Sequence, residues 1–323
     1  ATDCTVTNGT LTVTDHIPDF NDLQAIVDAA APNAVIYLNG TNYIAKPGQS
    51  VVRINKTITI YGCSQDDPSL MATLDAQGHC NIFECTDELT LNVSNIEFIN
   101  GYSSGDGGAI EFRGNLTVNN CIFTNNSLEL SDSFGGAIGG DHDRVTVINS
   151  TFKNNHGNVG GAIGLEDGSV IVINSTFIEN TAEYNGGAIY GSRNCYVYNS
   201  KFIDNTAMMV GSIMAVNLTV SNSNFTNNSA PYMYPEIYCN NLNLSNSRFV
   251  DMNATGKEIV YVTKGNVTLN NNTITTNGIP IFNSDFERKF AVFTSPIYLK
   301  FENVKVLIGE NATLTAVLTD DNG

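Results

Sequence analysis

The sequence has few positive charges, no long apolar run and no metal-binding cysteine pattern, and each shortage excludes a class of function. Lysine and arginine account for only 15 of 323 residues, against 32 aspartates and glutamates, which gives a formal charge of −17. Duplex nucleic acid is therefore excluded as a partner, because binding it requires basic side chains that displace counterions. No apolar run approaches the roughly 20 residues of a membrane-spanning helix, so we expect no direct membrane insertion.

The seven cysteines and four histidines do not have the spacing of a zinc site. An odd number of cysteines leaves at least one thiol free or paired between chains. Cys63, Cys80 and Cys85 lie close together in the sequence and are the disulfide candidates. The chain begins at Ala1 without a basic and apolar leader, which is expected of a secreted protein whose signal peptide has been removed.

Asparagine is the residue in excess, with 44 copies, and it creates 16 Asn-x-Ser/Thr sequons. Such sequons predict exposed, glycosylated turns of a secreted protein. The alternative is that a chain rich in Asn, Ser and Thr contains them by chance. The candidate glycosylation sites are Asn8, Asn39, Asn55, Asn92, Asn115, Asn125, Asn149, Asn174, Asn217, Asn224, Asn227, Asn243, Asn253, Asn266, Asn271 and Asn311.

An internal repeat decides the fold. Gly-Gly-Ala-Ile occurs at residues 107–110, 135–138, 160–163 and 186–189, with degenerate copies at 210–213 and 234–237. A Phe-x-x-Asn marker runs in step with it, and the phenylalanines from Phe98 to Phe249 recur every 23 to 29 residues. This period is too short for a βαβ unit, whereas two or three short strands with Asn and Gly turns fit one coil of a parallel β-helix.

The strand pattern orients each coil. Leu116 and Val118 are expected to point inward, with Thr117 outward between them, and their equivalents to stack in columns. About ten coils from Val35 to Phe282 would form a rod about 50 Å long. We predict an N-terminal strand and helical cap over 1–34, with the helix at 19–30, a β-helix over 35–290, and at 291–323 a C-terminal cap or the beginning of a further β domain.

These motifs carry a family resemblance. The Gly-Gly-Ala-Ile and Phe-x-x-Asn pairing resembles the repeats of chlamydial polymorphic outer-membrane proteins. Residues 23–26, 35–41 and 73–78 make the wider layout similar to adhesin-like surface proteins of methanogenic archaea, over roughly residues 17 to 290. Residues 304–323 are similar to the opening strands of the Ig-like repeats that often follow in those proteins. The resemblance implies an all-β, right-handed, single-stranded parallel β-helix.

Alignment of the coils on the Ile of the repeat predicts one charged turn. Arg113, Asp141 and Glu166 occupy the third position after that Ile, and Asp167 and Arg193 the fourth. If register holds, Asp141 and Glu166 lie about 5 Å apart, a separation that suits Ca²⁺ binding or a retaining glycosidase. The alternative is a solvated turn whose opposite charges neutralise each other. Ca²⁺ is the sole cofactor hypothesis.

The loops before the repeat are the most variable edge of the predicted rod. Phe134, Tyr184 and Tyr232 place aromatic rings near the loop tips, where they would stack on sugars or pack against a protein. The alternative is that these side chains fold back over the coil.

The function expected from these features is that of a non-enzymatic, adhesin-like protein at the cell surface, outside the cell, which binds glycans or surface proteins of other cells. One alternative is a structural spacer or self-assembling filament whose C-terminal strands pair with a neighbouring copy. The other is a polysaccharide lyase or hydrolase, since β-helices host both enzymes and binding proteins.

Overall fold

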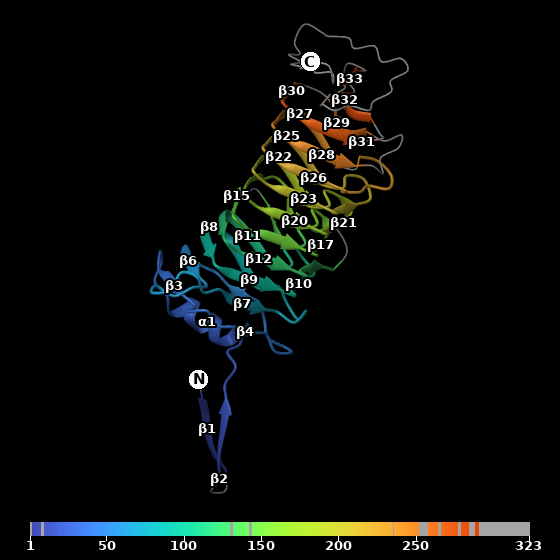
Figure 1. The fold of residues 1–323 in the computed structure, drawn as a ribbon. Helices are drawn as coiled ribbons and strands as arrows, with labels where there is room; N and C mark the ends of the chain where they lie inside the picture. The colour runs from blue at the N-terminus through green and yellow to red at the C-terminus, as the bar shows by residue number, and fades with distance from the viewer. Residues whose placement is uncertain are drawn as a thin grey trace.

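The computed structural model of the protein describes residues 2–7, 10–129, 132–141, 144–234, 236–251, 258–263, 266–276, 279–283 and 288–290. These residues form a parallel β-solenoid of about nine turns, close to the ten coils predicted (Figure 1). The predictions for residues 291–323, and for the sequons at Asn8, Asn253 and Asn311, lie outside the described residues.

Three sheets run along the solenoid in the described part of the chain. The long sheet contains 16 strands: β3 (Val35–Tyr37), β5 (Val52–Arg53), β6 (Ile58–Tyr61), β8 (Phe83–Ser94), β11 (Ile110–Asn119), β14 (Ile138–Gly140), β15 (Arg144–Ile148), β18 (Ile163–Leu165), β19 (Ser169–Ile173), β22 (Ile189–Tyr198), β25 (Ile213–Ser221), β27 (Ile237–Ser245), β29 (Glu258–Val262), β30 (Val267–Asn270), β32 (Ile279–Asn283) and β33 (Arg288–Phe290).

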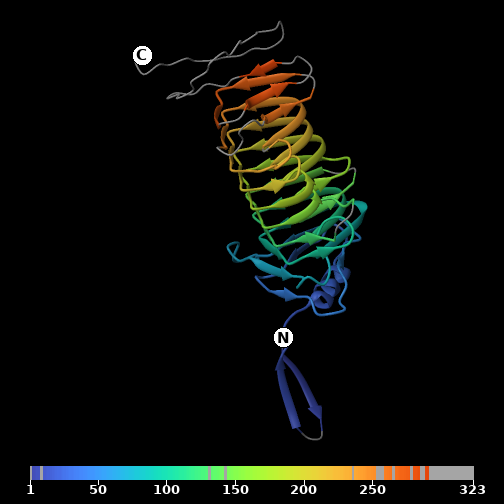
Figure 2. The same ribbon diagram turned by 90° about the vertical axis from the view of Figure 1, so that its right-hand side faces the viewer.

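The phenylalanine sheet contains ten strands: β4 (Tyr43–Ile44), β7 (Ala72–Asp75), β9 (Ile96–Ile99), β12 (Ile122–Thr124), β16 (Thr151–Lys153), β20 (Thr176–Ile178), β23 (Lys201–Ile203), β26 (Asn224–Thr226), β28 (Arg248–Asp251) and β31 (Thr273–Thr276). The short sheet contains five: β10 (Tyr102–Ser103), β13 (Ser127–Leu128), β17 (His156–Val159), β21 (Thr181–Asn185) and β24 (Thr206–Ala207). Neighbouring coils pair in parallel, and Figure 2 shows them stacked as the steps of one rod.

The N-terminal end of the rod is covered by the predicted helix, α1 (Phe20–Ala29). Asp19 begins it with a capping box, in which its carboxylate accepts from the backbone N–H of Asn21 and Asp22 while the Asp22 carboxylate accepts from the N–H of Asp19. Phe20, Leu23 and Val27 form its buried face, so the helix closes the hydrophobic interior at that end. An antiparallel hairpin, β1 (Thr2–Thr7) and β2 (Thr10–Asp15), precedes it.

A stack of phenylalanines fills the interior beneath the phenylalanine sheet. From Phe98 to Phe249, one ring per coil lies nearly parallel to the next, with ring centroids 4.4–4.9 Å apart. Opposite them, the predicted inward columns are buried, including Leu116 and Val118. Each aromatic pair adds about 0.5–1.5 kcal/mol beyond the area that it buries. The repeat period is therefore the spacing at which the same side chain returns to the same column.

The asparagines of the Phe-x-x-Asn marker form a buried ladder. In Asn126, Asn155, Asn180 and Asn205 the side-chain Nδ2 donates both to the Oδ1 of the next asparagine, at 2.8–2.9 Å, and to the carbonyl of the phenylalanine in the preceding coil. Asn228 ends the ladder by donating to Glu236 Oε2 at 2.8 Å. Buried amides are tolerated here because each finds its partners in the coils on either side.

A second ladder was not predicted. Ser150, Ser175, Ser200, Ser223 and Ser247 are buried at another corner, where each hydroxyl accepts from the backbone N–H of the residue one coil earlier and donates to the carbonyl two residues before it. Cys121 occupies the same place in its coil, with Sγ 3.3 Å from the carbonyl oxygen of Asn119.

Corner geometry explains the abundance of asparagine. Twelve asparagines of successive coils adopt a left-handed backbone with φ of 48° to 57°: Asn95, Asn100, Asn120, Asn125, Asn149, Asn154, Asn174, Asn199, Asn222, Asn227, Asn246 and Asn271. Asparagine tolerates this region better than other non-glycine residues. The second glycine of the repeat serves a different need, since a Cβ on Gly161 would lie 2.1 Å from the carbonyl oxygen of Gly187.

The ladder makes a stability prediction. Replacement of Asn180 by Ala should lower the free energy of unfolding by about 2–4 kcal/mol, because it removes the hydrogen bonds that the Asn180 side chain makes with buried groups of Asn155, Asn205 and Phe152. Asn243→Ala, at an exposed strand position, is the matched control and should change it by less than about 0.5 kcal/mol. Denaturant unfolding followed by circular dichroism measures both, and equal effects would contradict a structural ladder.

Candidate functional site

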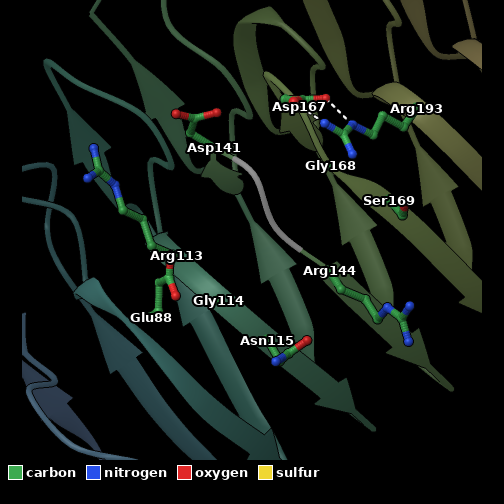
Figure 3. Close-up of a pocket in the computed structure, with 10 residues that line it drawn as sticks. All are labelled: Glu88, Arg113, Gly114, Asn115, Asp141, Arg144, Asp167, Gly168, Ser169 and Arg193. Atoms are coloured by element: carbon green, nitrogen blue, oxygen red, sulfur yellow. Dashed lines mark hydrogen bonds and ion pairs between the residues drawn. The ribbon is translucent and has the colours of Figure 1, made fainter.

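A charged groove crosses several coils on the outer face of the long sheet. Its volume is about 540 Å³, and it lies where each coil changes direction between two parts of that sheet (Figure 3). Its wall consists of residues that directly follow β14 and β18, the first residues of β15 and β19, and parts of β8, β11 and β22. Its lining consists of Glu88, Arg113, Gly114, Asn115, Asp141, Arg144, Asp167, Gly168, Ser169 and Arg193.

The groove brings together some of the predicted residues and not others. Arg113, Asp141 and Asp167 line it, as does Arg193. Glu166 is not among its lining residues, although its backbone N–H donates to the carbonyl of Gly140 at 3.1 Å. Asp141 and Glu166 directly follow the register partners Gly140 and Leu165 of neighbouring coils, and both lie close enough to Asp106 to raise its pKa. That the two carboxylates act together in one site stays a prediction.

The ion pairs of the groove are partly those expected. Arg193 binds Asp167 through two of its nitrogens, and this contact raises the pKa of the guanidinium (Figure 3). A corresponding pair between Arg113 and Asp141 was expected and is not formed. Arg113 and Arg144 make no ion pair with any residue in the described part of the chain. The groove thus holds donor groups that are available to a ligand.

The balance of donors and acceptors defines the chemistry of the groove. Three arginines and three carboxylates line it, so it carries no net charge on a protein that is otherwise strongly acidic. Asn115 and Ser169 add uncharged polar groups. Guanidinium groups only donate hydrogen bonds and carboxylates only accept them, whereas a sugar hydroxyl does both. Within the described residues, no group of three His, Cys, Asp or Glu side chains is placed to hold a metal ion.

Two carboxylates that the sequence did not single out lie beside this region. Burial raises the pKa of Asp106, and the nearby charges of Glu166 and Asp141 raise it further, against the lowering effect of a hydrogen bond from the Phe134 N–H. Burial together with the charges of Asp106 and Glu84 raises the pKa of Glu111. Glu111 and Glu84 are register partners in β11 and β8, which explains their mutual effect.

The three aromatic loop residues singled out by the sequence differ in how far they are buried. Phe134 folds back over the coil: its N–H donates to Asp106 Oδ1 at 2.7 Å, and its half-buried ring lies 5.8 Å from that of Tyr190. Gly139 allows this approach, because a Cβ there would lie 2.0 Å from the Phe134 carbonyl oxygen. Phe134 is thus part of the wall of the solenoid. Tyr184 and Tyr232 remain exposed, by 47% and 76%.

The disulfide candidates carry free thiols. Cys63 and Cys85 are buried, Cys80 is half-buried, and no disulfide links them in the structure. The physical reason is position: Cys85 lies in the core column, as the register partner of Phe112, whereas Cys80 lies in the turn before that strand.

The sequons follow the architecture of the coil. Asn149 and Asn174 are exposed corner residues with left-handed backbones, and the residue after each is a buried serine of the ladder. Asn115 and Asn217 lie in strands, each followed by an inward leucine and an outward threonine. Alternation between outward polar and inward residues thus produces Asn-x-Ser/Thr. Glycosylation of these sites stays a prediction.

Comparison with known proteins agrees with this architecture. A family model described as "Right handed beta helix region" matches residues 135–291. No curated protein and no solved structure gives a significant match. No helix in the described residues is long and apolar enough to cross a membrane. The fold is therefore a right-handed parallel β-helix with an N-terminal capping helix, a class that includes enzymes as well as structural and surface proteins.

The reactivity of the cysteine thiols tests whether Cys121 and Cys195 are buried inside the solenoid. Burial raises the pKa of Cys121 and of Cys195 to about 12, so neither should form the reactive thiolate at pH 8 while the protein is folded. Half-buried Cys80 should react with a maleimide first among Cys80, Cys121 and Cys195. Peptide mapping by mass spectrometry before and after unfolding measures the order. Labelling of Cys121 at the rate of Cys80 in the native protein would contradict the structure.

Proposed function

We propose that this chain is the non-catalytic binding region of an adhesin-like protein outside the cell, and that its charged groove binds a glycan. The observation that carries the proposal is the composition of the groove, in which three arginines and three carboxylates from successive coils face one channel with no net charge. Vicinal hydroxyls of a sugar match such a mixture of fixed donors and acceptors.

The rigidity of the scaffold supports this proposal. Strands of the β-helix hold the groove residues, and hydrogen-bonded ladders lock each coil to its neighbours, so little ordering is needed when a ligand binds. Aromatic side chains lie on the same strand as the groove: Tyr190 and the exposed Tyr196 are outward residues of β22, as is Arg193. Aromatic faces beside polar groups are typical of sugar-binding surfaces.

The geometry favours binding over hydrolysis. A glycosidase needs two carboxylates on either side of one glycosidic bond, with one of them protonated as the acid. In the groove, Asp167 is engaged by Arg193, and Glu166 is not part of the lining. We therefore propose a role without bond cleavage, and an assay for reducing ends or unsaturated products on the bound polysaccharide is the direct check.

A charge-matched pair of variants tests the groove. Asp167→Asn with Arg193→Gln removes one anion and one cation from the lining, whereas Lys153→Gln with Glu179→Gln removes a comparable exposed pair, 3.7 Å apart, from the phenylalanine sheet. On a broad panel of host, plant and microbial glycans, the wild type should bind a defined subset. The groove variant should bind that subset at least about tenfold more weakly, and the control should match the wild type.

The panel should be run with Ca²⁺ and with a chelator, which decides whether a cation takes part. Both variants are surface substitutions, so their melting temperatures should equal that of the wild type. Retention of no glycan at all would contradict the proposal and favour the spacer or filament. Undiminished binding by the groove variant would move the glycan site elsewhere on the rod.

A further inference from the structure

A second surface is built by the loops that precede three successive coils. Tyr184, Met208, Met209, Tyr232 and Met233 form it, and we call it the Tyr–Met edge. Tyr232, Tyr184 and Met233 are among the most exposed large apolar residues of the described chain, at 76%, 47% and 40%. Apolar groups gathered in this way on a soluble surface commonly mark an interaction site.

The edge is one continuous and ordered surface. The backbone N–H of Met209 donates to the carbonyl of Tyr184 at 2.9 Å, and that of Tyr232 donates to the carbonyl of Met208 at 3.2 Å. Each loop is thereby held against the next, as the coils beneath are. The exposed side chains therefore stand on a backbone that is fixed before any partner arrives, which reduces the entropy lost on binding.

Packed tyrosines support the edge from below. The Tyr234 ring stacks on Tyr261 with centroids 4.3 Å apart, and Tyr238 is parallel to Tyr261 at 5.6 Å. The Tyr234 N–H donates to the carbonyl of Met209 at 2.8 Å, which ties this stack to the loops. Burial, aided by the neighbouring tyrosines and Glu258, raises the pKa of Tyr234.

The side-chain chemistry of the edge favours a protein over a glycan. Methionine thioethers are weak acceptors that do not satisfy sugar hydroxyls, but they pack against irregular apolar surfaces of proteins. Tyrosine and methionine are enriched at the cores of protein interfaces. Three of the five residues of the edge are methionines, which is half of the six in the whole chain.

Charge narrows the choice of partner. No lysine or arginine occurs between Lys201 and Arg248, the stretch that supplies four of the five residues of the edge. The exposed carboxylate of Glu183 adjoins Tyr184, and Glu258 lies near Tyr234. A second copy of this chain, also at −17, is repelled. We infer that the Tyr–Met edge docks a protein whose contact surface has an apolar centre surrounded by lysine and arginine.

Selection from a phage-displayed library of random dodecapeptides tests this inference. The wild-type chain is the target, and the triple variant Tyr184→Ser, Tyr232→Ser, Met233→Ser is used for counter-selection. Enriched peptides should combine aromatic or leucine residues with flanking Lys and Arg. A synthetic copy of the best peptide should bind the triple variant at least about tenfold more weakly than the wild type. Tyr196→Ser, which removes an exposed tyrosine outside the edge, should bind it as the wild type does.

Three results would overturn the inference. The first is no enrichment of peptides over the counter-selected library, and the second is equal peptide binding by the wild type and the triple variant. The third is that the triple variant loses glycan binding while the wild type binds no peptide. The last would make the edge a sugar platform. Equal melting temperatures of the variants confirm that folding is intact. The Asp167→Asn, Arg193→Gln variant should keep full peptide binding, so this inference and the glycan groove succeed or fail separately.

Discussion

Hydrogen bonding between coils in fixed register is the constraint on which the rest of this structure depends. Each strand pairs with the same strand one coil away, so a side chain at a given position always stacks on its counterparts. A polar group inside such a column has no access to water, so it needs hydrogen-bond partners in its own coil or in the adjacent coils. The buried asparagine and serine ladders are both solutions to this problem.

The register also explains what could be predicted from the sequence. The inward aliphatic columns and the capping helix are present as predicted, because each depends only on periodicity and on one-dimensional patterns. The Phe-x-x-Asn marker gave the repeat period, and the structure adds that its rings stack and its amides form a buried ladder. The serine ladder has an equally regular sequence pattern, an Asn-Ser dipeptide that recurs with its serine at Ser150, Ser175 and Ser200. It was hidden because Ser150 and Ser175 also fall within Asn-x-Thr sequons.

The site was harder to predict, since it depends on departures from the repeat. Loops between the coils differ in length, so alignment on the repeat did not show that Asp167 faces the groove while Glu166 does not. It also did not show that the main chain at Phe134 crosses over Gly139, because a glycine in an outward position leaves no mark in a hydrophobic pattern. The pKa values of Asp106 and Glu111 are raised by burial first and then by neighbouring carboxylates, neither of which a one-dimensional pattern shows.

Departures from the repeat coincide with most of the Tyr–Met edge, whereas the charged groove lies along coils that keep the intact repeat. Gly-Gly-Ala-Ile becomes Val-Gly-Ser-Ile at 210–213 and Tyr-Pro-Glu-Ile at 234–237, and these are the coils whose loops carry the exposed methionines and Tyr232. The same change puts Glu236 into the column of small residues, where it is fully buried and receives the last amide of the asparagine ladder. In this coil the alanine position of the repeat holds a large side chain, and its carboxylate ends the asparagine ladder. The loop before it also departs from the sequence of the regular coils. The regular coils thus set the rod's stiffness and carry the charged groove, whereas the coils in which the repeat is degenerate carry most of the Tyr–Met edge.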